Sequence, residues 1–161
     1  MSKIKELLND KDTVIAFDVD RVLAVLEFGE YSHFTLHDDE WVDAVNNGTG
    51  LYDDDKVSLK MQNYLKTRDM NNIYVITRSS GSKEDNVKRD YLMRNYNILS
   101  NNIYYVRGEL EKKDKLNEIK NKYPDLEDYK LLMVDDTINV LNDIKDNTNY
   151  STVHISSFLD L

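Results

Sequence analysis

Carboxylate side chains stand in pairs directly after two apolar runs of this 161-residue chain. Asp18 and Asp20 directly follow an apolar run at residues 14–17, and Asp135 and Asp136 follow another that ends at Val134. Neighbouring carboxylates repel one another unless a cation or a shared proton relieves the repulsion. Two such pairs therefore indicate an acidic site that binds a cation.

A further polar group follows the apolar run at residues 73–76, where Thr77 and Arg78 come first. Ligands of open α/β sheets bind at the carboxyl ends of the strands. Three strands that end in acid or hydroxyl side chains at one edge of a sheet therefore predict a shared site. Oxygen ligands without histidine or cysteine favour Mg²⁺.

Apolar runs alternate with amphipathic segments along the chain, which predicts an α/β fold with a doubly wound, mostly parallel sheet and helices on both faces. We expect one domain, residues 1–161, with a small irregular flap at about 28–54 and a β-hairpin over 24–34. Val87, Tyr91 and Leu92 should face inward from one helix, and Asp55 should cap another. Strands are expected at 14–17, 73–76, 103–106, 129–134 and 151–155, and helices at 3–8, 55–70, 83–96, 116–123 and 138–144.

Composition limits the classes of function. A net charge of −9 argues against extended contact with nucleic acid, although it allows a local pocket for one phosphate. The absence of cysteine excludes disulfides and thiolate chemistry. No segment has the apolar length of a membrane span or the pattern of a signal peptide, so a cytoplasmic location without membrane contact is expected.

The order and spacing of these residues resemble the haloacid dehalogenase-like (HAD) phosphohydrolases, from about residue 13 to the end of the chain. Asp18-Val19-Asp20 matches the first family motif, Thr77 the second, a lysine near a helix start the third, and Asp135-Asp136 the fourth. The resemblance implies a magnesium-dependent phosphatase that hydrolyses phosphomonoesters through an aspartyl-phosphate.

Roles follow from the resemblance for the matching positions. Asp18 would be the nucleophile, Asp20 the general acid and base, and Thr77 a hydrogen-bond donor to the phosphoryl group. The Mg²⁺ ligands would be Asp18, the backbone carbonyl of Asp20, and the pair Asp135 and Asp136.

Three lysines compete for the third motif: Lys112, Lys113 and Lys115. Asp114 is the best N-cap nearby, and it would place Lys115 at the first helical position with Ile119 one turn later. Lys115 is therefore the first choice and Lys112 the second.

Two arginines are candidate substrate ligands. Arg21 stands where the family usually has glycine, and it either reaches an anionic substrate group or points to solvent. The segment TRSSGSKED at residues 77–85 is similar to one in phage polynucleotide kinase 3′-phosphatase domains, which implies that Arg78 contacts phosphate. The kinase P-loop GxxxxGK[ST] does not occur.

The substrate stays open: a phosphorylated small molecule, a nucleotide or a nucleic-acid 3′ end. The small flap predicts an open site, which a second subunit could close. A catalytically silent HAD-like binding or assembly protein is the main alternative. A phospho-acceptor receiver domain is disfavoured, because there the acidic pair comes early and the lysine last.

Overall fold

The computed structural model describes residues 3–25, 37–48, 50–53 and 56–161. Its frame is a five-stranded sheet in the order β3-β2-β1-β4-β5, with every neighbouring pair parallel. The strands are β1 (Val14–Phe17), β2 (Ile73–Arg78), β3 (Ile103–Val106), β4 (Leu131–Asp135) and β5 (Ser151–His154). The predicted doubly wound α/β sheet is confirmed, with β1 at its centre.

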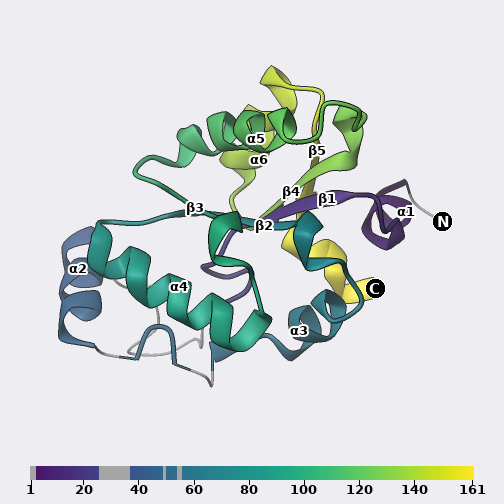
Figure 1. Ribbon diagram of the computed structural model, residues 1–161. Coiled ribbons are helices and arrows are strands. Elements are labelled where there is room, and N and C mark those ends of the chain that lie inside the picture. Colours follow the sequence, from purple (N-terminus) through teal and green to yellow (C-terminus); the bar gives the residue numbers. More distant parts are fainter. Residues whose placement is uncertain (1–2, 26–36, 49, 54–55) are drawn as a thin grey trace.

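Helices cover both faces of the sheet (Figure 1). On one face lie α1 (Lys3–Asn9), α3 (Leu59–Leu65) and α4 (Ser82–Tyr96), with α2 (Asp38–Asn47) beside α4. On the other lie α5 (Lys112–Asn121) and α6 (Ile138–Asn147). None of the helices in the described residues is long and apolar enough to cross a bilayer.

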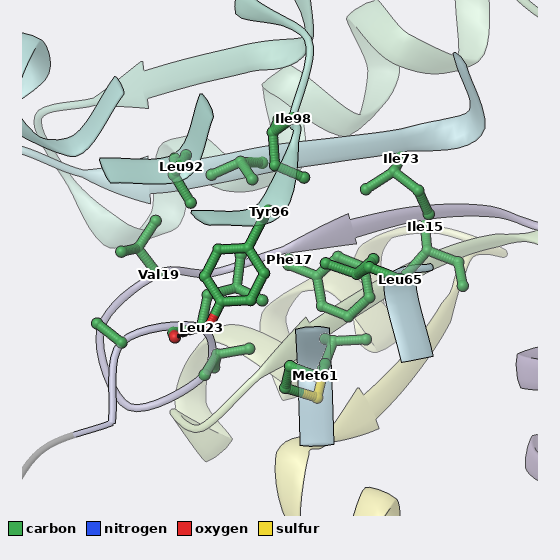
Figure 2. Close-up of a cluster of buried hydrophobic side chains, with 14 of the residues drawn as sticks. Ile15, Phe17, Val19, Leu23, Met61, Leu65, Ile73, Leu92, Tyr96 and Ile98 are labelled. Atoms are coloured by element: carbon green, nitrogen blue, oxygen red, sulfur yellow. Dashed lines mark hydrogen bonds between the residues drawn. The ribbon is translucent and has the colours of Figure 1, made fainter. Parts of the chain in front are cut away.

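Two cores form because strand side chains alternate between the faces of the sheet. Ile15, Phe17 and Ile73 pack toward α3 and α4, together with Leu92 and Tyr96 of α4 (Figure 2). Val75 belongs to the same cluster. The alternate positions pack toward α5 and α6: Val14, Ala16, Tyr74, Ile76, Leu131 and Met133. The same alternation, continued past the apolar runs, turns Thr77 toward α4, and Asp18 and Asp135 toward α5.

The predicted flap is a helix over part of its length. Residues 38–47 form α2, which ends at Gly48 in the left-handed conformation with φ 67°. The prediction of irregular structure there is wrong, because Trp41 and Val45 are spaced to give the helix one packed face. Residues 28–36 of the flap, and most of the hairpin expected over 24–34, lie outside the described residues.

Helix α3 is shorter than the predicted helix over residues 55–70. It begins after Ser58, whose hydroxyl accepts a hydrogen bond from the backbone N–H of Met61. Val57, just before Ser58, forms a β-bridge with Ala24, so the helix does not extend back over that residue. The expected cap, Asp55, lies outside the described residues.

Candidate active site

Three carboxylates meet where β1 and β4 end. Phe17 pairs with Val134 across the two strands, so Asp18 and Asp135 come next side by side. The backbone N–H of Asp18 donates to Val134 O at 2.9 Å. Asp18 is 6% exposed and Asp135 0%. One carboxylate oxygen from each of Asp18, Asp135 and Asp136 lies within 4.8 Å of the others.

Lys112 brings a buried ammonium group to these carboxylates. It is the first residue of α5, on the face of the sheet toward which Asp18 and Asp135 point. Its Nζ lies 2.8 Å from Asp135 Oδ2, 3.1 Å from Asp18 Oδ1 and 2.9 Å from Glu109 Oε2. An ammonium has three protons to donate, and here three carboxylates surround it.

The other two candidate lysines pair elsewhere. Helix α5 starts at Lys112 after Glu111, so the prediction that Asp114 caps it is wrong. Lys115 therefore lies one turn inside the helix, where its Nζ is 2.6 Å from Glu118 Oε1. Lys113 pairs with Asp143 at 3.3 Å. The structure brings Lys112 to the acidic cluster, not Lys115.

Burial and charge shift the protonation of the cluster. Burial raises the pKa of Asp18 to about 7, with Asp135 and Asp20 adding to the rise and Lys112 opposing it. Burial also raises the pKa of Asp135, although the Lys112 ammonium acts to lower it. Burial alone would lower the pKa of Lys112, but Asp18, Asp135 and Glu109 outweigh it and raise that pKa. Carboxylates thus outnumber the one ammonium, and the oxygen donor set of Asp18, Asp135 and Asp136 fits a hard divalent cation.

Asp20 lies on the opposite side of the sheet edge, against a second buried lysine. Asp20 Oδ2 is 2.8 Å from Lys88 Nζ, and Asp20 Oδ1 accepts a hydrogen bond from Tyr52 Oη at 2.8 Å. Lys88 is completely buried and also contacts Glu84 Oε1 at 2.9 Å. The cluster of Lys88, Glu84 and Tyr52 around Asp20 is called here the Lys88 cluster.

Sequence reasoning missed Lys88. Val87 was expected to face inward, but it is 38% exposed, and its neighbour Lys88 takes the inward position. Lys88 comes three and four residues before Tyr91 and Leu92, which are both buried on α4. A lysine on the apolar face of a helix, four residues after Glu84, was the available signal.

Thr77 is buried in the same region. Its hydroxyl accepts a hydrogen bond from Lys88 Nζ at 3.2 Å and donates to Arg78 O at 3.3 Å. Among the described residues that line the neighbouring cavity, this part of the chain contributes Arg78, Ser79 and Ser80 but not Thr77. The threonine expected to bind phosphate thus contacts Lys88 in this arrangement.

A cavity of about 350 Å³ opens over the carboxylates. Asp18, Asp20 and Asp136 border it, and the guanidinium-bearing side chains of Arg21, Arg78 and Arg107 line it as well. Trp41 and Val42 of α2 add an apolar wall. The cavity thus joins carboxylates, cations and one apolar surface; Arg107 and Trp41 were not predicted as site residues.

Arg21 occupies an unusual backbone conformation. Its φ is 64°, in the left-handed region that favours glycine, the residue usual at this family position. Its Nη1 lies 2.9 Å from Asp136 Oδ2, so the side chain turns to the acidic cluster. Arg107, by contrast, binds both oxygens of Asp85, at 2.9 and 2.7 Å.

The acidic pairs at the ends of β1 and β4 and the lysine that begins α5 are the arrangement implied by the sequence resemblance. The chain has a HAD-like fold. No family model matches the sequence, and no curated protein matches it.

Two similar solved structures are both of the HAD domain of effector protein Lem4 from Legionella pneumophila. One has 14% sequence identity and a TM-score of 0.48, with 88% of this chain and 84% of that chain covered. The other, an inactive mutant, has 14% identity and a TM-score of 0.46, with coverages of 92% and 91%.

Proposed function

We propose that this protein is a magnesium-dependent phosphatase that hydrolyses phosphomonoesters, with Asp18 as the nucleophile. The observation that carries the proposal is the position of Asp18. Its carboxylate borders the cavity. On the interior side, Lys112 contacts this carboxylate and Asp135 lies beside it. Guanidinium groups on the cavity wall would attract an anionic ester to this carboxylate.

In the first step, an oxygen of Asp18 bonds to phosphorus and the bond from phosphorus to the leaving-group oxygen breaks. Asp20 gives its proton to that oxygen, so an alcohol leaves and an aspartyl-phosphate remains. Lys112 keeps the Asp18 carboxylate oriented through the contact at 3.1 Å.

In the second step, water attacks phosphorus, and the bond between phosphorus and the Asp18 oxygen breaks. Asp20 takes a proton from this water, inorganic phosphate leaves, and both carboxyl groups return to their starting state. Both oxygens of Asp20 accept hydrogen bonds in the structure, which corresponds to the ionised form that takes up a proton in this step, whereas the first step begins with Asp20 protonated.

A bound Mg²⁺ would neutralise charge between the carboxylates and the phosphoryl oxygens. Asp18, Asp135 and Asp136 would hold it, and the backbone carbonyl of Asp20 is proposed as a further ligand. As substrates we propose phosphorylated small molecules, nucleotides or nucleic-acid ends. The net charge of −9 favours the smaller esters over long polyanions.

The test is release of inorganic phosphate from a panel of nucleotides, sugar phosphates and 3′-phosphorylated oligonucleotides. We expect activity with Mg²⁺, none in EDTA, and inhibition by beryllium fluoride with magnesium. In heavy-oxygen water, a single turnover should label the released phosphate and not Asp18.

The matched variant is Asp18→Asn, a nearly isosteric change that removes the nucleophile. It should be folded and inactive. An active Asp18→Asn protein, or full activity in EDTA, contradicts the mechanism. A wild-type protein that is inactive on the whole panel supports the catalytically silent alternative.

A further inference from the structure

Two buried lysines serve the two aspartates of the first motif from opposite faces of the sheet. Lys112 of α5 contacts Asp18, and Lys88 of α4 contacts Asp20. Helices α4 and α5 lie on opposite sides of the sheet (Figure 1). Lys112 belongs to the third motif of the resemblance, whereas none of its four motifs includes Lys88.

We propose that Lys88 is a positioning residue that, together with Tyr52, holds the Asp20 carboxylate in the orientation for proton transfer. The inference rests on the proposed phosphatase function. It assigns to the Lys88 cluster the task of keeping the general acid and base directed at the cavity.

Both carboxylate oxygens of Asp20 are held by hydrogen bonds. Tyr52 donates to Oδ1 at 2.8 Å and Lys88 donates to Oδ2 at 2.8 Å. Rotation of the carboxylate would break at least one of these bonds, one of them charge-assisted. Asp20 nevertheless borders the cavity, so the two bonds fix its orientation without covering it.

The two donors to Asp20, Lys88 and Tyr52, are themselves held in place by further contacts. Lys88 Nζ lies 2.9 Å from Glu84 Oε1 and 2.5 Å from Arg78 O. Glu84 accepts a hydrogen bond from Trp41 Nε1 at 3.1 Å. The ring of Tyr52 packs edge-on against that of Trp41, with the centroids 6.3 Å apart. Asp20 is therefore tied to α2, α4 and the end of β2, which form one part of the cavity wall.

The free energy of burying the Lys88 ammonium also favours a role in orientation. Burying an ammonium group between carboxylates costs several kcal/mol of desolvation, and apolar replacements of such groups are often neutral or stabilising. The adjacent inward positions of α4 are Tyr91 and Leu92, so this face packs large side chains readily. The stability of the fold therefore does not account for a buried ammonium group at Lys88. Its role in orienting Asp20 does account for it.

The experiment compares two esters that differ in their need for a proton. The phenolate of p-nitrophenyl phosphate leaves without protonation, whereas the alkoxide of glycerol 2-phosphate requires it. The double variant Lys88→Met with Glu84→Gln removes the ammonium and its second carboxylate partner together. The net charge of the buried cluster therefore does not change. Its matched control, Glu84→Gln alone, keeps the contact between Lys88 and Asp20.

We expect the double variant to lose about 10- to 100-fold more kcat/KM on the alkyl ester than on the aryl ester, part of the usual worth of a general acid. The control should lose the same factor on both. In an Asp20→Asn background, the double variant should not change the ratio of the two rates further, because Lys88 acts through Asp20.

Equal losses on both esters, or the same ratio change with and without Asp20, overturn the inference while the phosphatase function stands. A wild-type protein inactive on both esters and on the substrate panel overturns the function and this inference with it. If the double variant fails to fold, Tyr52→Phe removes the other hydrogen bond to Asp20 without changing charge. It must then show the same selective loss on the alkyl ester, and equal losses reject the proposal.

Discussion

Replacing Lys112 with methionine should destabilise the protein strongly. The change removes the ammonium that lies between Asp18, Asp135 and Glu109, at 3.1, 2.8 and 2.9 Å. Removing one partner of a buried ion pair costs about 3–5 kcal/mol, because the remaining charge is left uncompensated. With a urea m-value of about 2 kcal/mol per M, the unfolding midpoint should fall by about 1.5–2.5 M.

The assay is urea unfolding in EDTA, so that no added cation replaces the lost ammonium. Lys115→Met is the matched control on the same helix. The side chains of Lys115 and its partner Glu118 are 30% and 50% exposed, and such a pair contributes about 0–1 kcal/mol. The midpoint of the control should move by less than about 0.5 M. Similar shifts for the two variants would refute the assignment of Lys112 as the buried charge partner.

Two further predictions concern the edges of the site. Arg21→Gly should relieve about 1–2 kcal/mol of strain in the left-handed backbone at this position. It should also remove the ion pair between Arg21 and Asp136, which contributes less stability than the strain costs. Its melting temperature should not fall, and its Mg²⁺ affinity by calorimetry should rise, because Asp136 no longer pairs with Arg21; weaker Mg²⁺ binding would contradict this. Burial opposes the ionisation of Glu84, but Lys88 and Ser80 outweigh it and lower its pKa below 4.5. The stability lost in Glu84→Gln should therefore be constant above about pH 4.5 and shrink as the pH falls through the lowered pKa. A difference that stays unchanged in urea titrations from pH 7 to pH 3 would speak against this.

The sheet could be predicted from the sequence because its signals are local. The apolar run at Val14–Phe17 matches β1 at both ends, and Asp18, which follows it, meets Asp135 and Asp136 at the end of β4. The parallel sheet accounts for this meeting, since strand ends that are far apart in sequence come to one edge. Fold class and the acidic cluster therefore follow from short patterns.

The lysines could not be assigned by the same reasoning. The choice of Lys115 depended on where α5 begins, and helix ends are the least certain feature of a sequence pattern. Lys88 was overlooked because a lysine within a charged helix is ordinarily solvated. Its role depends on Asp20 and Tyr52, which are distant in sequence. The spacing to Tyr91 and Leu92 places Lys88 on the apolar face of α4, but tertiary packing decides which partners it meets there.

The central place of β1 also bears on how the protein is made. Phe17 pairs with Val75 on one side and with Val134 on the other, so one edge of β1 has no partner until the chain has been synthesised as far as β4. An unpaired apolar edge is prone to aggregation, and pairing across such separations is slow. During synthesis, Asp18 would remain without Asp135 and Asp136 until β4 docks. Cation binding at the three carboxylates would thus report that β4 has joined the sheet, and shortened chains that stop before β4 would neither bind the cation nor escape aggregation.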